Sequence, residues 1–493
     1  MMPAFGVAAF LVVGAQGAAL SLSDRIQMGE CVDSTTAPAS LFPDSFRLGD
    51  IPSTGVTAAE PAVTAAGLMT ITYANHFKVI TEKLSKEQYV LTQCGMNEPT
   101  AQEVDVVVPL ETGYQRKFFT IPLQRVIPDT TIGLSMLEAL GVQDRVSHVS
   151  EFATGACWQK ALTCAQPLEG SWNGNATIRE AQLTSVDAVF MDCSGDCEAL
   201  RARSNAVHFP AAKDNGNLHS AEHVKFLAAF FNLEDVASQA FDQAVASYPP
   251  IPESANAPLV AWAQYNSWTS RWEVNMASFR VQMTEAAGGR MLSGTDLEQH
   301  GFGSADAVFG NPAAGKVYYL SVNESEAGDK EAKATTLMTA LADVDWLVDE
   351  FWYATPSDYK FTNFLTNFHL ESTSQLKFVK DRQVLRYDGT LSSSDGWDWL
   401  ESRLARPDWA VNGLARYLQG NTAKTQMYFR NVATGEMPRI VSAAECTEML
   451  PVCDATASEE AIKSPAAAAT DLSGAGSYAF AVVPSLLALM QLQ

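Results

Sequence analysis

The sequence predicts an α/β protein of two lobes, with mostly parallel sheets, joined by one long helix. Short apolar strand patterns alternate with helical patterns in both halves of the chain, which is typical of parallel sheets covered by helices on both faces. Between the halves, residues 219–248 form one helical pattern that ends at Pro249-Pro250. At about 1.5 Å per residue, such a helix is long enough to bridge two lobes.

The first lobe is expected at residues 67–218, after a loosely ordered lead-in at residues 20–66 that is rich in Ala, Ser, Thr and Pro. Thr130 and Thr131 are expected to cap a helix at Leu134–Leu140, which Gly141 ends. Strands are expected from apolar alternation or short apolar runs. They lie at Ile71–Phe77, Glu87–Thr92, Asp105–Pro109, Val146–Val149, Asp187–Asp192 and Ala206–Phe209.

The second lobe is expected at residues 249–450, where the α/β pattern restarts after the long helix. Its first strand is expected at Leu259–Ala263, followed by a helix at Glu273–Ala287 that Gly288-Gly289 closes. A strand at Trp346–Glu350 and a late helix at Asp408–Leu418 follow.

The two ends of the chain predict export. Residues 1–19 carry an apolar run and then Gly17-Ala-Ala, the order of a secretory signal peptide. At the other end, small residues lie within a spacer at residues 451–477, and an apolar tail follows at residues 478–493. This order predicts a GPI anchor at the extracellular face of the plasma membrane. A secreted protein and a short membrane anchor are the alternatives.

Cysteine usage agrees with export, because an even number of cysteines in an exported chain predicts disulfides. The eight are Cys31, Cys94, Cys157, Cys164, Cys193, Cys197, Cys446 and Cys453. Closeness in sequence favours Cys157–Cys164, Cys193–Cys197 and Cys446–Cys453 as local pairs, which leaves Cys31 and Cys94. Asn175 and Asn323 begin glycosylation tripeptides.

The charge balance excludes one class of partner. The formal net charge is −23, so the surface repels nucleic-acid phosphates, and nucleic acid is not an expected partner. The sequence has neither a Gly-x-Ser-x-Gly elbow nor a His-Glu-x-x-His helix. No residues nominate a catalytic site, and the protein is not expected to be an enzyme.

Several stretches in a fixed order carry a family resemblance. They are Pro122-Leu-Gln-Arg-Val-Ile, Leu137-Glu-Ala-Leu-Gly, Ala221-Glu-His-Val-Lys-Phe, Pro258-Leu-Val-Ala-Trp and Ala286-Ala-Gly-Gly. Together they resemble periplasmic binding proteins of the iron-siderophore and cobalamin type (class III), over roughly residues 68–440. The stretches that start at Val384, Asp398 and Tyr428 are similar to surface ferrichrome-binding-type proteins of marine microalgae.

The resemblance implies capture of a ferric siderophore, hydroxamate-like, or a similar iron chelate in a cleft between the lobes, for uptake. It implies no covalent cofactor. No lipobox Cys follows the signal, so docking to a bacterial permease is not implied, and the downstream uptake partner is unknown.

A cleft for such a chelate needs aromatic walls and a few donors to its oxygens, and Arg suits paired oxygens. The segment 265–272 supplies both types just after the second lobe's first strand, where ligand crevices lie in parallel sheets. The expected ligand-binding residues are Arg271, Trp268, Trp272, Trp158, Trp352, Tyr353, Thr130 and Thr131. The alternative is that these aromatics are core residues.

Two other functions remain open. His219 and His223 stand one turn apart on the expected helix, a spacing that can clasp a metal ion, although no third ligand is evident. Direct metal binding is therefore one alternative. A surface enzyme or adhesion protein that uses the same fold is the other.

Overall fold

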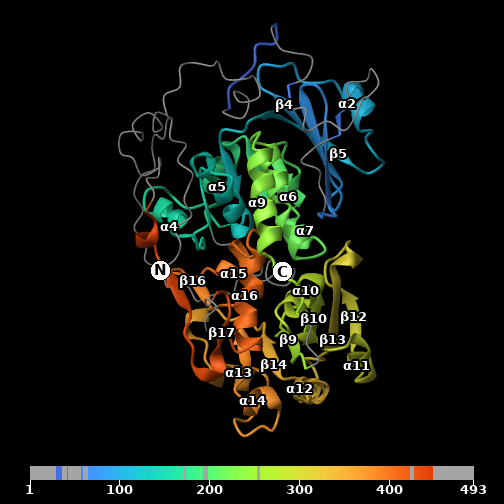
Figure 1. Ribbon diagram of the computed structural model, residues 1–493, viewed down its shortest axis with the longest axis vertical. Helices are drawn as coiled ribbons and strands as arrows, with labels where there is room; N and C mark the ends of the chain where they lie inside the picture. Colours follow the sequence, from blue (N-terminus) through green and yellow to red (C-terminus); the bar gives the residue numbers. More distant parts are fainter. Residues whose placement is uncertain are drawn as a thin grey trace.

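The computed structural model describes residues 29–35, 41–42, 57–58, 65–170, 174–192, 198–252, 256–421 and 427–447. The expected signal peptide and apolar tail, with Cys193, Cys197 and Cys453, lie outside these residues. Within the described ranges, no helix is long and apolar enough to cross a membrane. Figure 1 shows two lobes stacked along the long axis, the N-terminal one above the C-terminal one.

The first lobe opens with a five-stranded sheet in the order β1-β2-β3-β4-β5. Neighbours pair antiparallel except β4 and β5, which are parallel. The strands are β1 (Thr57–Ala58), β2 (Met69–Tyr73), β3 (Phe77–Glu82), β4 (Glu87–Gln93) and β5 (Gln115–Ile121). The strand expected at Asp105–Pro109 is wrong. Helix α2 (Ala101–Val107) forms instead, because Thr100 and Glu103 make a reciprocal capping box.

A second sheet in this lobe has three parallel strands, β6 (Val126–Pro128), β7 (Ala188–Met191) and β8 (Ala206–His208). The strands expected at Asp187–Asp192 and Ala206–Phe209 are confirmed as β7 and β8. Val146–Val149 forms no strand, only a single bridge between Val146 and Val126. The helices here are α3 (Leu134–Ala139), α4 (Ala156–Leu162), α5 (Ala176–Thr184) and α6 (Glu198–Arg201).

The region expected as one long helix consists of three successive helices. They are α7 (Asn217–Ala221), α8 (Val224–Ala229) and α9 (Glu234–Ser247). Asn232 has a φ of 58°, a left-handed conformation that a right-handed helix cannot contain. Lys78 also donates a hydrogen bond to the carbonyl of Ala229 at 2.9 Å, where α8 ends. The left-handed conformation of Asn232 and the hydrogen bond from Lys78 together account for the break between α8 and α9.

The second lobe is built on an eight-stranded sheet with the order β12-β13-β10-β9-β14-β15-β17, and β11 pairs with β9. Parallel pairings join β9 to β11 and β14, and β14 to β15, whereas the other ladders are antiparallel. The sheet is therefore mixed rather than mostly parallel. The strands are β9 (Leu259–Asn266), β10 (Arg271–Ala277), β11 (Arg290–Met291), β12 (Gly303–Asp306), β13 (Gly315–Ser321), β14 (Trp346–Asp349), β15 (Val384–Arg386) and β17 (Arg430–Asn431).

Strand β9 confirms the expected start of the second lobe. Ala261 and Ala263 face one core cluster and Val260 and Trp262 face another, which explains a continuous apolar run. The helix expected at Glu273–Ala287 begins only at Ser278, because β10 occupies its first part. Trp272 and Val274 pack in the same cluster, and a period of two belongs to a strand.

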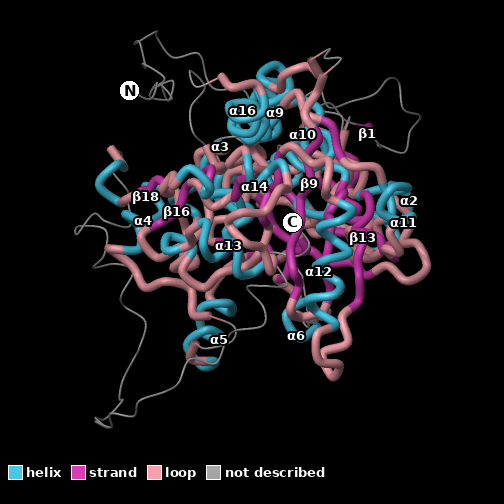
Figure 2. The backbone as a smooth tube through the Cα atoms, turned by 90° about the horizontal axis from the view of Figure 1, so that it is seen from below, coloured by secondary structure: helices cyan, strands magenta, loops and turns pink. Residues whose placement is uncertain are grey.

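Helices cover both faces of this sheet, and a two-stranded parallel sheet, β16 (Thr390–Ser392) with β18 (Arg439–Val441), lies outside it. Figure 2 shows α10 and α16 beside α9 on one side of the molecule. The helices are α10 (Ser278–Ala286), α11 (Gly294–Gln299), α12 (Asp329–Ala340), α13 (Phe361–Asn367), α14 (Lys377–Lys380), α15 (Asp398–Glu401) and α16 (Pro407–Leu418). The expected late helix at Asp408–Leu418 is confirmed as α16.

Candidate functional site

The lobes meet along a contact that we call the seam. From the first lobe it contains residues 129–135 and 209–217, the loops that follow β6 and β8, together with residues 152–159. From the second lobe it contains α10, α15, residues 307–314 and β18. Ligand crevices of α/β proteins lie beyond the carboxyl ends of strands, so the seam is the place where a binding site is expected.

One end of the seam is fastened covalently. Cys157 at the start of α4 forms a disulfide with Cys446, which follows β18. Beside it, Glu401 of α15 accepts hydrogen bonds from the backbone N–H groups of Thr154 and Gly155 at 2.6 and 2.8 Å. We call this region the disulfide end.

The Cys157–Cys446 bridge corrects two expected pairings. Its partners are 289 residues apart, so the local pairs Cys157–Cys164 and Cys446–Cys453 are wrong. Cys157 lies in α4 and Cys164 lies just past its end, and seven residues of helix span about 10 Å, beyond the roughly 4.4–6.8 Å between the Cα atoms of a disulfide. Cys31–Cys94 is confirmed, with Cα atoms 4.8 Å apart.

Glu401 is a buried carboxyl group at the boundary between the lobes. Burial, and then the neighbouring carboxyl of Asp398, raise the pKa of Glu401 to about 8, although the two backbone N–H groups oppose this. Burial also raises the pKa of Asp398, whose Oδ1 accepts from Thr154 Oγ1 at 3.2 Å. Protonation of this carboxyl pair is therefore coupled to the lobe contact.

The opposite part of the seam is joined by side-chain amides, and we call it the amide end. Asn217 Nδ2 donates to the carbonyl of Phe279 at 2.9 Å, and the Asn217 N–H donates to Gln282 Oε1 at 3.0 Å. Asn311 Nδ2 donates to the carbonyl of Lys213 at 2.7 Å. Hydrogen bonds of this kind each contribute about 1 kcal/mol net, so this end is held less firmly than the disulfide end.

Charged side chains are buried beside the amide end. Arg280 Nε donates to Glu350 Oε1 at 2.8 Å. Arg403 is only 1% exposed and has no carboxylate partner among the described residues; its guanidinium lies 4.2 Å from the ring centre of Phe279 and 4.9 Å from that of Trp399. Its Nε donates to nothing in the described part of the chain. Burial, and then the charge of Arg280, lower the pKa of Arg403 to about 9.

Asp214 faces these groups from the first lobe. It accepts from the backbone N–H groups of Gly67 and Leu68 and lies 2.8 Å from His223 Nε2. Burial alone would raise its pKa, but the hydrogen bond and charge of His223 hold the pKa of Asp214 at about 2. The His223 imidazole is therefore already paired with the Asp214 carboxylate. The described residues contain no group of three or more His, Cys, Asp or Glu side chains that would hold a metal ion.

A small cavity lies inside the seam at the amide end. Its volume is about 10 Å³, and its lining comes from both lobes. The polar and aromatic lining residues are Asp214, Asn275, Phe279 and Arg280. Phe309, next to the lining residue Val308, is 95% exposed. Small-molecule sites need about 300–1,000 Å³, so the lobes are closed on one another here.

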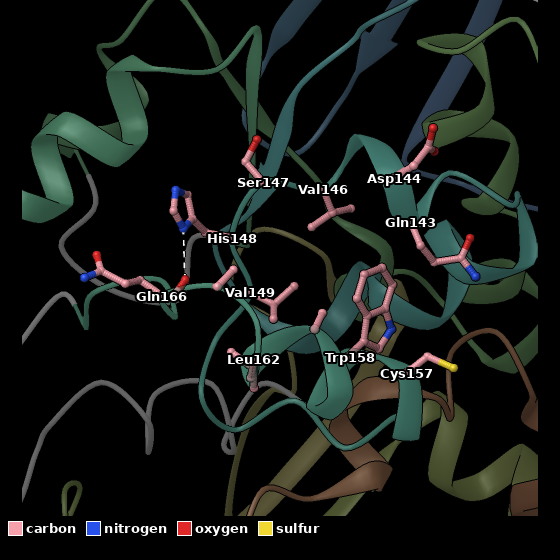
Figure 3. A pocket seen from close by; sticks show the side chains of 12 residues that line it. Gln143, Asp144, Val146, Ser147, His148, Val149, Cys157, Trp158, Leu162 and Gln166 are labelled. Carbon is pink, nitrogen blue, oxygen red and sulfur yellow. Dashed lines mark hydrogen bonds between the residues drawn. The ribbon is translucent and has the colours of Figure 1, made fainter. Parts of the chain in front are cut away.

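A larger cavity, of about 60 Å³, lies within the first lobe. Figure 3 shows its walls, with Trp158 beside Cys157, and His148 Nδ1 hydrogen-bonded to the carbonyl of Gln166 at 3.0 Å. Trp158 is buried, and its indole N–H donates to no described residue. This space is also too small for a chelate.

The structure places the expected ligand-binding residues in separate regions. Thr130 and Thr131 lie at the seam, where the turn at Thr131–Gly133 contacts α15. Of the eight expected ligand-binding residues, only Trp158 lines one of the two cavities, the larger cavity within the first lobe.

The other expected residues lie within the second lobe. Trp268 is 45% exposed at the turn between β9 and β10, and Arg271 stacks on Tyr319 of β13. Trp272 is fully buried, with its indole N–H donating to the carbonyl of Lys330 at 3.0 Å. Trp352 and Tyr353 follow β14 and pack against the two core clusters of this lobe.

The seam residues that sequence reasoning missed were hidden by the misassigned helix. Asn275 lies in β10 and Phe279 and Arg280 lie in the first turn of α10, just after that strand ends, so a helix expected from Glu273 onwards concealed the strand end that places them at the seam. Asp214 carried a usable signal, because Lys213-Asp-Asn-Gly216 is a polar turn in the loop that follows a buried strand, β8.

The fold and the seam define a two-lobed α/β protein whose lobes close on a small cavity, which has Asp214, Asn275 and Arg280 among otherwise apolar lining residues. No protein-family model and no curated protein sequence matches the chain. Similar solved structures include a possible iron-binding, periplasmic solute-binding protein from Staphylococcus epidermidis, at 12% identity and a TM-score of 0.40, covering 60% of this chain and 99% of that one.

An ABC transporter substrate-binding protein from Listeria monocytogenes has 13% identity and a TM-score of 0.41, covering 60% of this chain and 100% of that one. An ABC-type Fe³⁺-hydroxamate transport system protein from Saccharomonospora viridis has 15% identity and a TM-score of 0.40, covering 60% and 93%. Identities this low do not define a ligand.

Proposed function

We propose that this protein captures a small iron chelate, such as a ferric siderophore, between its lobes at the cell surface and presents it for uptake. The observation that carries the proposal is the seam cavity. Asp214 of one lobe and Asn275 and Arg280 of the other converge on a space between two lobes, and binding sites occur preferentially at such boundaries.

Binding requires the seam to open, because the cavity holds only about 10 Å³. The amide end is the part that opens in this proposal, since Asn217 and Asn311 hold it through hydrogen bonds. The disulfide end stays closed, since the Cys157–Cys446 bond crosses it. Opening would expose Phe279 and would bring the exposed ring of Phe309 to the edge of the widened cleft.

The finer parts of the proposal come from the sequence. The iron-chelate class rests on the resemblance of the stretches at Val384, Asp398 and Tyr428 to surface ferrichrome-binding-type proteins. The location at the extracellular face rests on the expected signal peptide and lipid-anchor signal. The paired Cys31–Cys94 and Cys157–Cys446 agree with an oxidising compartment.

The test is a ligand panel on the purified secreted chain, read by tryptophan fluorescence and calorimetry. Ferric hydroxamate, ferric catecholate, haem and cobalamin are titrated separately. Saturable binding of at least one iron chelate supports the proposal, and binding of none of the four overturns it.

A matched pair of surface variants locates the site. Phe309→Ser removes an exposed ring beside the cavity and is expected to weaken binding about ten-fold without lowering stability. Val106→Ser removes an apolar side chain that is 60% exposed on α2 and is the control, with unchanged binding. Equal binding by the two variants would place the ligand elsewhere.

A second candidate function is a surface structural or adhesion role with permanently closed lobes. The Cys157–Cys446 bond and the Glu401 contacts favour it, because they fix the lobes together at one end. This candidate expects no chelate binding and no change in amide hydrogen exchange at Asn217 and Asn311 when chelates are added.

A further inference from the structure

We infer that the ligand captured at the seam is anionic, and that Arg403 together with Arg280 receives its negative charge. This inference rests on the proposed function and narrows its ligand class to chelates that carry carboxylate or catecholate oxygens with net negative charge. The described structure gives three observations for it.

The first observation is that Arg403 is a buried cation without an anion. It is 1% exposed, and its contacts are the rings of Phe279 and Trp399. A buried charge without a partner costs several kcal/mol, so such a residue indicates a partner that arrives from outside the chain. Aromatic faces stabilise a guanidinium but supply no oxygen acceptor.

The second observation is the charge count around Phe279. The guanidinium carbons of Arg403 and Arg280 lie 4.2 and 4.4 Å from its ring centre. Glu350 pairs with Arg280 through Oε1. Two cations therefore meet one carboxylate here, which leaves an excess positive charge. Glu350 Oε2 accepts no hydrogen bond from any described residue, so the pair is not fully satisfied within the chain.

The third observation is position. Phe279 and Arg280 line the cavity between the lobes, and Phe279 touches both guanidiniums. Asp214, on the facing wall, is already bonded to His223 and to backbone N–H groups, so it does not supply the missing anion. A ligand that enters when the amide end opens therefore arrives one side chain away from the uncompensated charge.

The net charge of the protein predicts how salt changes the rate at which an anionic ligand associates. The chain carries a formal net charge of −23, which opposes the approach of an anion. Salt screens that repulsion over about 10 Å at 0.1 M. Association of an anionic chelate is therefore expected to become faster as salt is added, whereas association of a neutral chelate is expected to stay constant.

The experiment compares a ferric catecholate that carries net negative charge with a neutral ferric trihydroxamate, using fluorescence titration of the full secreted chain. The wild type is expected to bind the anionic complex at least about ten-fold more tightly than the neutral complex. Arg403→Met removes the charge and keeps a long apolar side chain, so it is expected to lose this preference, and Arg403→Lys is expected to restore part of it.

Arg382→Met is the matched control, because Arg382 also stacks on a ring, that of Phe361, but on the surface of the second lobe. It is expected to keep the full preference. Equal wild-type affinity for the two chelates, or a preference that survives in Arg403→Met, overturns the inference while the proposed function stands. Binding of neither chelate, nor of haem or cobalamin, overturns the proposed function itself. If Arg403→Met does not fold, the wild-type comparison of the two chelates still decides.

Discussion

Asp388 holds two buried arginines in the second lobe. Its Oδ2 accepts from Arg386 Nε at 2.7 Å and its Oδ1 accepts from Arg430 Nε at 2.6 Å. Burial opposes ionisation, but the two guanidiniums keep the pKa of Asp388 below its usual range. The carboxylate therefore stays charged and links β15 to β17, at the edge of the central sheet.

Replacing Asp388 by Asn is expected to lower the free energy of unfolding by about 3–5 kcal/mol, because two buried cations lose their shared anion. Urea denaturation followed by far-UV circular dichroism measures the change. Asp306→Asn is the control, since the Lys316–Asp306 pair is largely exposed and its loss is expected to leave stability unchanged within error. Equal stability of Asp388→Asn and wild type would contradict this account.

Glu401 gives the seam a pH dependence of a definite sign. Its pKa is raised to about 8 by burial and by Asp398, from an ordinary value of 4.5. A group with a raised pKa stabilises the fold fully below its unfolded pKa and loses that contribution as pH rises through the folded value. Stability is therefore expected to fall between about pH 4.5 and 8, a window that does not include the titration of Asp214 near 2.

Thermal melts of the wild type and Glu401→Gln across pH 5 to 8 test this expectation. Gln keeps a neutral side chain at every pH, so the slope of melting temperature against pH is expected to be shallower in the variant. Parallel slopes for the two proteins would show that Glu401 does not titrate in this range.

At the scale of elements, the disulfide between α4 and the segment after β18 is expected to be the larger of two covalent contributions. It closes a loop with a sequence separation of 289, against 63 for Cys31–Cys94. In the chain-entropy account, longer loops give more stabilisation. Replacing both Cys157 and Cys446 by Ser is expected to lower the free energy of unfolding by about 2–5 kcal/mol.

Chemical denaturation of this double variant, beside the Cys31→Ser/Cys94→Ser variant, measures the two effects. The variant without Cys157 and Cys446 is expected to unfold at the lower denaturant concentration. The opposite order would mean that native contacts such as those of Glu401, rather than the crosslink, hold the disulfide end together.

The sequence alone could predict those strands that are buried on both faces and are therefore apolar along their length. β9 and β14 are buried on both faces, so their apolar runs identify them directly. β10 was missed because its polar residues, Glu273 and Asn275, are buried and hydrogen-bonded, which gives no clean alternation. α2 was missed because valines favour strands, whereas the capping box at Thr100 decides the structure.

The candidate site was less predictable for a related reason. Arg280 and Asp214 come from different lobes and meet only through the tertiary fold. Arg403 sits in a sequence that reads as an ordinary amphipathic segment, and nothing local shows that its guanidinium is buried without an anion. The sequence instead favoured the aromatic residues near Arg271 as ligand-binding residues, although Trp272 belongs to the core.

For the whole molecule, closure of the lobes depends on the amide end. Replacing Asn217 and Asn311 together by Ala removes the side-chain hydrogen bonds to Phe279 and Lys213. The lobes are expected to open more often, with faster amide hydrogen exchange in residues 209–217 and 307–314 and little change near Cys157. Exchange that rises equally at both ends would mean that the lobes separate as a whole rather than at one end.

The same crossing disulfide makes the two halves of the molecule inseparable by proteolysis alone. The chain passes between the lobes near Ile251, which is 63% exposed and therefore open to a protease. A single cut there would leave Cys157 and Cys446 still bonded, so the nicked protein would migrate as one species without reductant and as two fragments with it. Reduction of the Cys157–Cys446 bond would then be required before the two halves of the nicked protein could separate.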